Sequence, residues 1–279
     1  MKDSHSFHIR LKGGINLEKT EKSGQCFRWI EDGQGSFLIP AGGMLARVSE
    51  SGDGIDVNLL SLLPKKRPAA EIEQFWKKYF DADLDYEAIR KMPDKKDKFL
   101  SRAVAESEGI RIIYQEPFET LITFIISQRK SIPAIKTSVE RICTTVGRKI
   151  PGTDVYDFPS PKELTALSGE ELSACGLGYR APYIHAAAES IYHGDIDLDN
   201  MAALSDDDLL ESLMALNGVG VKVANCTALF GFHRLDLFPI DVWIQRALDT
   251  YYEGAFPLEK YHPYNGIMQQ YIFAYRGQL

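Results

Sequence analysis

The sequence predicts an α+β protein, with an N-terminal antiparallel β-sheet domain followed by a mostly α-helical region. Up to about residue 60, short β-prone segments alternate with turn residues. From about residue 69, apolar residues recur at helical spacing, and helix-capping signals continue through the rest of the chain. With 279 residues, 44% of them hydrophobic, the chain can bury a real core. We expect a sheet domain with flanking helices over 1–108 and a helical region over 109–279.

Four segments of the first region are predicted to be strands. Residues 7–11 alternate between apolar and polar side chains and end before the turn glycines Gly13 and Gly14. Residues 26–30 are followed by Asp32-Gly33, a dipeptide typical of tight hairpins. The other two strands follow the same pattern and span residues 36–39 and 44–48.

The helices are predicted from apolar spacing and from capping signals. The first begins near residue 69 and has one apolar stripe at i, i+3, i+4, i+7 and i+8, made by Ile72, Phe75, Trp76, Tyr79 and Phe80. An N-cap serine followed three residues later by an acid marks the starts of later helices, at Ser160, Ser168 and Ser205. Glycine is expected at helix C-terminal ends, at Gly176, Gly218 and Gly231.

Composition narrows the function classes. The net charge of −7 argues mildly against nucleic acid as a partner, although backbone amides can bind phosphate without formal charge. The basic clusters at 65–67, 77–78 and 95–98 are each explained by solvated surface. Four scattered cysteines show no ligand spacing, so we expect no metal site. No apolar run is long enough to span a bilayer, and we expect a cytoplasmic protein without membrane contact.

The most informative segment is residues 216–222, with the sequence Leu-Asn-Gly-Val-Gly-Val-Lys. It connects the two helices of a predicted hairpin over about 205–231. Gly218 and Gly220 allow a tight turn, which leaves backbone N–H groups free to bind an anion. Lys222 falls in the first turn of the second helix, where the helix dipole disfavours its ammonium form. The segment therefore predicts a phosphate-binding hairpin that carries an amine nucleophile.

Asp241 follows Lys222 by 19 residues and stands just before another predicted helix. In isolation it is a plain N-cap, and Lys222 in isolation is a solvated surface lysine. Together, however, the hairpin and the Ile-Asp-Val sequence around Asp241 resemble the helix-hairpin-helix/Gly-Pro-Asp superfamily of DNA glycosylases. Its usual hairpin reads LPGVGxK, and Asn217 replaces the proline here. The resemblance implies that Asp241 is the catalytic aspartate and that Lys222 marks a bifunctional member, which also cleaves the strand.

Three further matches resemble the 8-oxoguanine DNA glycosylase family within that superfamily. Residues 23–29 match its SGQSFRW segment with Cys26 in place of serine, residues 178–183 match its GYRA element, and residues 269–273 match its Q-x-x-x-F. The resemblance implies a substrate pocket made by Gly24, Cys226, Gln269 and Phe273. The Gly24 carbonyl would accept the hydrogen that oxidation places on N7, Gln269 would bind the Watson–Crick edge, and Phe273 would stack on the base.

The same resemblance implies a set of DNA-binding residues, namely Asn217, Gly218, Val219, Gly220, Gln128, Arg129, Tyr179 and Arg180. One part of this set departs from the family. Animal members have an asparagine run followed by a cytosine-contacting arginine, whereas this chain has Gln-Arg-Lys-Ser at 128–131 and Ala134 at the arginine position. Arg180 still matches a second cytosine-contacting arginine. We therefore expect weaker selection of the opposite base.

The resemblance implies a bifunctional DNA repair glycosylase that excises 8-oxoguanine from duplex DNA. Base flipping, Schiff-base formation by Lys222 and β-elimination would be its steps. Two alternatives stay open, a monofunctional alkyl-base glycosylase of the same superfamily and a non-catalytic nucleic-acid-binding protein. Lys222 disfavours the first, and Asp241, Lys222 and the pocket set together disfavour the second. We expect a monomer that requires no cofactor, and an ion bound at the hairpin, monovalent or divalent, is left open.

Overall fold

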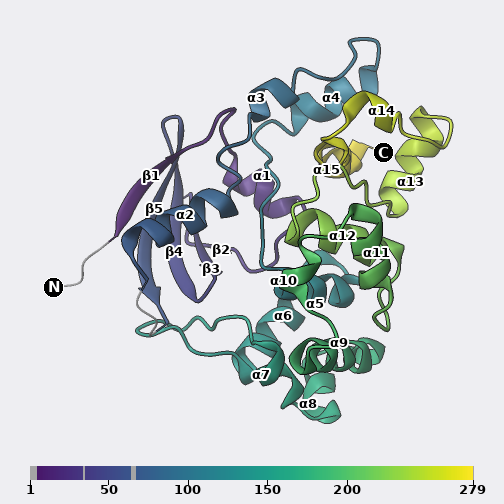
Figure 1. Ribbon diagram of the computed structural model, residues 1–279. Helices are drawn as coiled ribbons and strands as arrows, with labels where there is room; N and C mark the ends of the chain where they lie inside the picture. The colour runs from purple at the N-terminus through teal and green to yellow at the C-terminus, as the bar shows by residue number, and fades with distance from the viewer. Residues whose placement is uncertain (1–4, 34, 64–66, 279) are drawn as a thin grey trace.

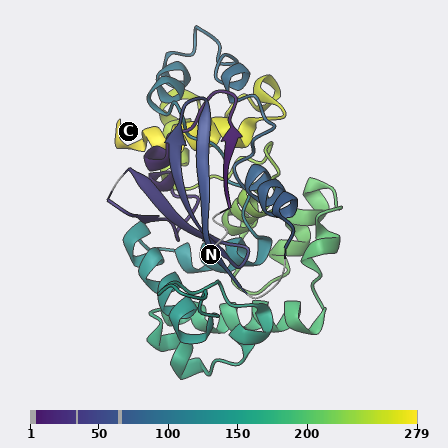
Figure 2. The same ribbon diagram turned by 90° about the vertical axis from the view of Figure 1, so that its left-hand side faces the viewer.

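The computed structural model describes residues 5–33, 35–63 and 67–278 and confirms the predicted α+β architecture (Figure 1). Five strands form one antiparallel sheet in the order β1-β5-β4-β3-β2, and Figure 2 shows this sheet facing the viewer with the helical region behind it. The strands are β1 (Ser6–Arg10), β2 (Ile30–Glu31), β3 (Ser36–Ala41), β4 (Met44–Ser51) and β5 (Gly54–Leu62).

The sheet packs against α2 (Ala69–Tyr79), which carries the predicted apolar stripe. In register, Val48 of β4 pairs with Val57 of β5, and both side chains are fully buried. Trp76 of α2 is fully buried in the same core, beside the stacked ring of Phe80. Alternate residues of the strands therefore supply one side of this core and the helix supplies the other.

The predicted strand over 26–30 is wrong, because only Ile30–Glu31 pairs with the sheet. Cys26 and Trp29 are buried in the sheet core, whereas Phe27 packs edge-on against Phe124 of the helical core, with ring centroids 5.8 Å apart. This segment therefore crosses between two cores instead of pairing along its length. Among residues 5–62, two elements were not individually predicted, α1 (Leu17–Lys22), which Asn16 caps, and β5.

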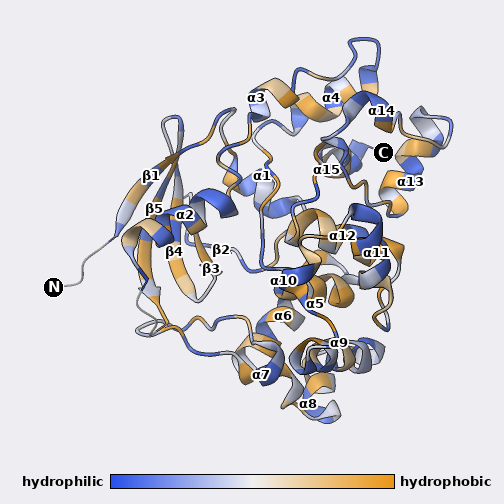
Figure 3. Cartoon of the chain, viewed as in Figure 1, coloured by the Kyte–Doolittle hydropathy of each residue, from blue (hydrophilic) through white to orange (hydrophobic). Residues whose placement is uncertain are grey.

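The helical region is built around α5 (Pro117–Ser127), which is largely hydrophobic in Figure 3 and is buried from Thr120 to Ile126. It packs against α12 and α6. The other elements are α3 (Tyr86–Ile89), α4 (Lys98–Glu106), α6 (Ile132–Val146), α7 (Pro161–Thr165), α8 (Gly169–Ala174), η1 (Gly178–Arg180), α9 (Ala181–His193), α10 (Leu198–Met201), α11 (Asp206–Met214), α12 (Val221–Gly231), α13 (Val242–Tyr251), α14 (Leu258–Tyr261), α15 (Asn265–Ala274) and η2 (Tyr275–Gln278).

The capping signals predict these helices well. Ser160 and Ser168 form complete capping boxes, and Ser205 caps α11. Of the predicted C-terminal glycines, only Gly176 follows a helix end closely. Helix α11 ends at Met214, four residues before Gly218, and Gly231 lies inside the last turn of α12. A Cβ there would lie 3.1 Å from the Cα of Pro117, so this glycine allows α12 to approach α5.

Three further expectations concern the first basic cluster, the domain boundary and membrane-spanning segments. Residues 65 and 66 of the first basic cluster lie outside the described residues. The domain boundary at 108/109 stays a prediction. Of the helices described, none combines the length and the apolar character that crossing a bilayer would need.

Candidate active site

The hairpin places Lys222 in the predicted position, as the second residue of α12. After α11 ends, Val219 N donates to Leu216 O at 3.1 Å and closes the turn. Gly218 has a φ of +80°, and Gly220 is the extended N-cap of α12. The first N–H groups of a helix have no partner within it, so the turn presents donors to solvent beside Lys222.

Gly218→Ala is expected to destabilise the protein by about 2 kcal/mol or more, because a left-handed backbone disfavours a side chain and the new Cβ would lie 2.4 Å from the Tyr183 ring. Denaturant unfolding measures this loss. Gly220→Ala is the matched control, since a Cβ there meets nothing within 4 Å. It should lose less than about 1 kcal/mol. Equal stability of the two variants would contradict the assigned role of Gly218.

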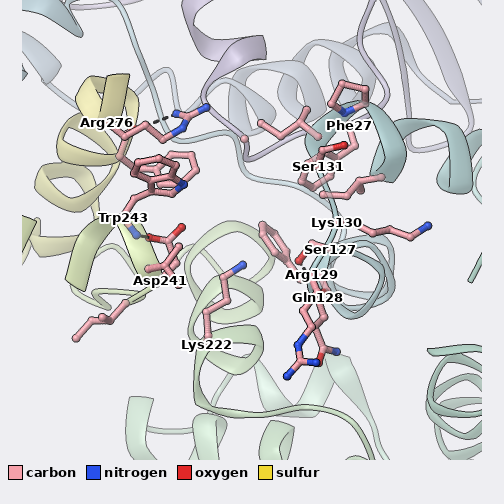
Figure 4. A pocket seen from close by; sticks show the side chains of 18 of the residues that line it. Phe27, Ser127, Gln128, Arg129, Lys130, Ser131, Lys222, Asp241, Trp243 and Arg276 are labelled. Carbon is pink, nitrogen blue, oxygen red and sulfur yellow. Dashed lines mark hydrogen bonds between the residues drawn. The ribbon is translucent and has the colours of Figure 1, made fainter. Parts of the chain in front are cut away.

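Asp241 is the N-cap of α13, as the sequence predicts. Its Oδ1 accepts hydrogen bonds from Trp243 N at 3.0 Å and Ile244 N at 2.9 Å. These two bonds fix the carboxylate at the start of the helix. Figure 4 shows the Asp241 carboxylate and the Lys222 amine projecting toward the same open space from two different helices.

That space is a cleft of about 930 Å³. Its walls are formed by the hairpin helix, the start of α13, the loop after α5 and the C-terminal end of the chain. The side chains and backbone that border it include Gly24, Phe27, Phe124, Ser127, Gln128, Arg129, Lys130, Ser131, Lys222, Ile240, Asp241, Val242, Trp243, Phe273 and Arg276. The cleft therefore combines an amine, a carboxylate, aromatic rings and further cations.

The surroundings of Lys222 suit a reactive amine. Its Nζ lies 5.1 Å from the centroid of the Phe124 ring. Within the described part of the chain, no carboxylate lies at ion-pair distance from this amine. Cys226 lies one turn later and is buried. Burial raises the pKa of the Cys226 thiol, against the opposing effect of the Lys222 charge, so the sulfur stays a neutral contact surface.

A second, smaller cavity of about 50 Å³ brings the predicted substrate-binding residues together. Gly24, Cys226, Gln269 and Phe273 all border it, as do Lys222 and Asp241. Its volume suits a few water molecules but not a purine. The reason is the position of Phe273, whose Cε1 lies only 2.9 Å from where a Cβ on Gly24 would stand. In this structure the Phe273 ring therefore covers Gly24.

Two glutamine side chains that the sequence did not single out hold the Gly24 peptide. Gln270 Nε2 donates to Ser23 O at 2.6 Å, and Gln115 Nε2 donates to Gln25 O at 2.7 Å. The carbonyls on both sides of Gly24 are thus fixed, and its φ of +77° requires glycine. The backbone on both sides of Gly24 is therefore held in place by side chains from distant parts of the chain.

Gln269 carries an unsatisfied acceptor at the same cavity. Its Nε2 donates to Pro239 O at 2.9 Å, whereas its Oε1 is buried and has no partner among the described residues. A buried polar atom without a partner is destabilising, and such atoms are rare. A ligand that donates a hydrogen bond would satisfy this oxygen.

The loop after α5 is hydrogen-bonded to the hairpin and to the buried side chain of Arg180. Gln128 Nε2 donates to Gly218 O at 3.0 Å, and Arg129 is exposed with a φ of +53°. Arg180 is only 6% exposed, because its guanidinium donates to Gln128 O and Leu177 O and stacks on Tyr179. The structure therefore places Arg129 at the tip of the loop and Arg180 beneath it.

Sequence reasoning missed Trp243 and Arg276 on the cleft wall. Trp243 follows Asp241 by two residues, and Arg276 follows Phe273 by three, which is helical spacing. That spacing is the signal that could have indicated Arg276. In the described residues, no group of three or more His, Cys, Asp or Glu side chains is arranged to hold a metal ion.

The fold and this cleft define a class. A sheet domain precedes a helical region in which a glycine hairpin, a lysine and a helix-capping aspartate meet, the arrangement of a helix-hairpin-helix DNA glycosylase. Two family models match consecutive parts of the chain, the 8-oxoguanine DNA glycosylase N-terminal domain over residues 9–121 and the HhH-GPD superfamily of base excision DNA repair proteins over residues 122–254. The chain belongs to the 8-oxoguanine DNA glycosylase family.

Individual relatives agree with this assignment. A probable N-glycosylase/DNA lyase of Methanothermobacter thermautotrophicus is 30% identical, over 87% of this chain and 84% of its own. The structure of MBOgg1 with a low-affinity DNA ligand has a TM-score of 0.88 at 33% identity, covering 100% of this chain and 97% of that one. The Clostridium acetobutylicum 8-oxoguanine glycosylase/lyase, bound to double-stranded DNA with cytosine opposite 8-oxoguanine, has a TM-score of 0.86 at 31% identity, covering 100% and 96%. The predicted family and enzyme class are confirmed.

Proposed function

We propose that this chain excises 8-oxoguanine from double-stranded DNA and then cleaves the strand at the resulting abasic site. The observation that carries the proposal is the small cavity at which Lys222 and Asp241 meet the substrate-binding set. An amine, a carboxylate and a base-recognition pocket are the three parts that such a reaction needs. The similar Clostridium acetobutylicum 8-oxoguanine glycosylase/lyase supports the choice of substrate, and the related N-glycosylase/DNA lyase supports strand cleavage.

Recognition would depend on the Gly24 carbonyl. Guanine has an acceptor at N7, whereas 8-oxoguanine has an N–H donor there. When the buried carbonyl faces the N7 acceptor of guanine, two acceptors meet without a hydrogen bond, and this weakens binding by on the order of 1–3 kcal/mol. The unpaired Oε1 of Gln269 would accept a second hydrogen bond, from the Watson–Crick edge of the extruded base. Because Phe273 covers Gly24 in the free protein, the ring moves aside and stacks on the base that enters.

The chemistry would be performed by two side chains. The neutral amine of Lys222 attacks C1′ of the extruded nucleotide, and the bond from C1′ to the damaged base breaks as the base takes the electron pair. The carboxylate of Asp241 stabilises the positive charge that develops at C1′. The covalent intermediate rearranges to an imine between Lys222 and the opened sugar. Loss of a C2′ proton then expels the 3′ phosphate by β-elimination.

The duplex would be bound by two elements that Gln128 connects. The N–H groups of the hairpin at 217–220 bind a phosphate near the lesion, and the loop at 128–131 enters the space that the flipped base leaves. We further propose that the protein acts as a monomer in the cytoplasm and requires no cofactor. The proposed function does not depend on an ion at the hairpin, and the proposal is compatible with a monovalent or divalent ion there.

Borohydride trapping tests this function. The protein is incubated with duplexes that contain 8-oxoguanine, an alkylated adenine or no damage, and borohydride reduces any imine to a stable covalent complex. We expect a covalent complex with the 8-oxoguanine duplex and none with the undamaged one. Release of alkylated base without trapping would favour the monofunctional glycosylase, and binding without any base release would favour a non-catalytic protein.

Opposite-base discrimination is expected to be weak, because Ala134 cannot contact a base and Arg180 is engaged with Gln128 O and Leu177 O. A bidentate arginine contact is typically worth about 1–3 kcal/mol of selection. Single-turnover excision opposite each of the four bases measures it. Ala134→Arg should sharpen the preference for cytosine, whereas Thr137→Arg, one turn further along α6, should not. A thousandfold preference for cytosine in the unmodified protein would show that other residues select it.

A further inference from the structure

Arg276 lies on the cleft wall and has no assigned role. It belongs to η2, which follows α15 directly. In Figure 4 its side chain lies on the same side of the cleft as Asp241 and Trp243, across from the loop that carries Arg129. Arg276 thus borders the same cleft as Lys222 and Asp241.

The guanidinium of Arg276 is only partly used by the protein. Its carbon lies 4.2 Å from the Phe273 ring centroid, and its Nη1 donates to Phe273 O at 2.9 Å. A guanidinium has five N–H donors, so most of them remain available. Among the residues that the structure describes, no carboxylate lies within ion-pair distance of Arg276.

The local electrostatics favour an anionic ligand. Burial lowers the pKa of Arg276, and the charge of Asp241 acts in the opposite direction. A partly buried cation without a counter-ion is unfavourable, and an anion that enters the cleft relieves this. Asp241 acts on Arg276 only at longer range, because no carboxylate of the described residues lies at ion-pair distance from this guanidinium. The planar fork of a guanidinium fits the oxygens of a phosphate.

We infer that Arg276 binds a phosphate that flanks the extruded nucleotide. The inference rests on the proposed function, which places the sugar of that nucleotide between Lys222 and Asp241. The phosphates attached to this sugar then lie near the cleft wall, within reach of the free N–H groups of Arg276. The alternative is that Arg276 has only a structural role, in which its guanidinium stacks on the Phe273 ring and donates a hydrogen bond to Phe273 O.

Salt dependence of DNA binding separates the two roles. Affinity is measured by fluorescence anisotropy over a range of KCl concentrations, for a duplex with a tetrahydrofuran abasic analogue and for an undamaged duplex. Loss of one phosphate contact lowers the slope of log Kd against log[KCl] by about 0.9. For the abasic-analogue duplex, Arg276→Gln should lose about one unit of slope and bind on the order of 10-fold more weakly. Arg276→Lys should keep the slope, because its charge is retained.

Lys162→Gln is the control, since Lys162 is an exposed lysine of α7 and its loss changes the net charge equally. Lys162→Gln should leave the slope unchanged. On undamaged duplex, Arg276→Gln and the unmodified protein should bind with nearly equal affinity and slope. An unchanged slope for Arg276→Gln on the abasic analogue, or an equal loss on undamaged duplex, overturns the inference. Because this readout is binding alone, a protein that shows it but excises no 8-oxoguanine contradicts only the proposed function.

Discussion

Lys222→Gln is expected to abolish covalent trapping on 8-oxoguanine duplex and to remove most base excision, while duplex binding changes by only a few-fold. The amide of glutamine cannot attack C1′, so no imine forms for borohydride to reduce. Binding persists because the hairpin N–H groups belong to the backbone, which the substitution leaves in place. Loss of the contact between Nζ and the Phe124 ring should lower stability by only about 0.5–1 kcal/mol.

The measurement compares trapping, single-turnover excision and anisotropy on the same 8-oxoguanine duplex. Lys98→Gln is a control, because Lys98 is likewise a lysine in the first turn of a helix, α4, but is exposed and lies outside the cleft. It should trap as the unmodified protein does. Persistent trapping by Lys222→Gln would assign the nucleophile to another amine, and loss of binding together with trapping would point to a collapsed hairpin instead.

Local signals explain how much could be predicted from the sequence. The capping serines, the apolar stripe on α2 and the glycine hairpin all depend on residues a few positions apart, and the structure places each of those elements as predicted. Lys222 and Asp241 share the cleft because each stands at the start of a helix, which sequence spacing can indicate.

Long-range contacts explain what the sequence could not predict. The segment 26–29 has the pattern of a strand. It does not pair with the sheet, because Phe27 packs against the Phe124 ring of the helical core. The support of the Gly24 peptide comes from Gln115 and Gln270, which lie 90 and 247 positions from the carbonyls that they bind. The sequence carries no periodic sign of either contact.

The burial of Arg180 changes how the loop at 128–131 is understood. From the sequence, Arg180 reads as a base-contacting side chain. In the structure its guanidinium holds the Gln128 carbonyl, and Gln128 in turn bonds to Gly218 of the hairpin. Arg129, at the loop tip, is the exposed cation of this assembly. These bonds hold the loop and the hairpin in a fixed relation to each other.

Asp241→Asn is expected to slow base excision on the order of 100-fold or more, with little change in DNA affinity or stability. A charge that acts on the positive centre forming at C1′ contributes mainly in the transition state, so its loss lowers the rate and not the binding. Asparagine is also a good N-cap, so the bonds from Trp243 N and Ile244 N to the side-chain oxygen can persist. The loss of stability should stay within about 1 kcal/mol, from the weaker interaction with the helix dipole.

Asp197→Asn is the control that separates the two roles of Asp241. Asp197 caps α10 and also accepts two backbone N–H bonds, from Asp199 and Asn200, each at 3.0 Å. The two variants lose the same charge from the same kind of cap, so their unfolding free energies should fall by similar amounts. Only Asp241→Asn should lose excision in single-turnover experiments. A near-normal rate for Asp241→Asn would reduce Asp241 to a helix cap, and an equal loss of rate in both variants would trace the effect to stability and not to the charge beside Lys222.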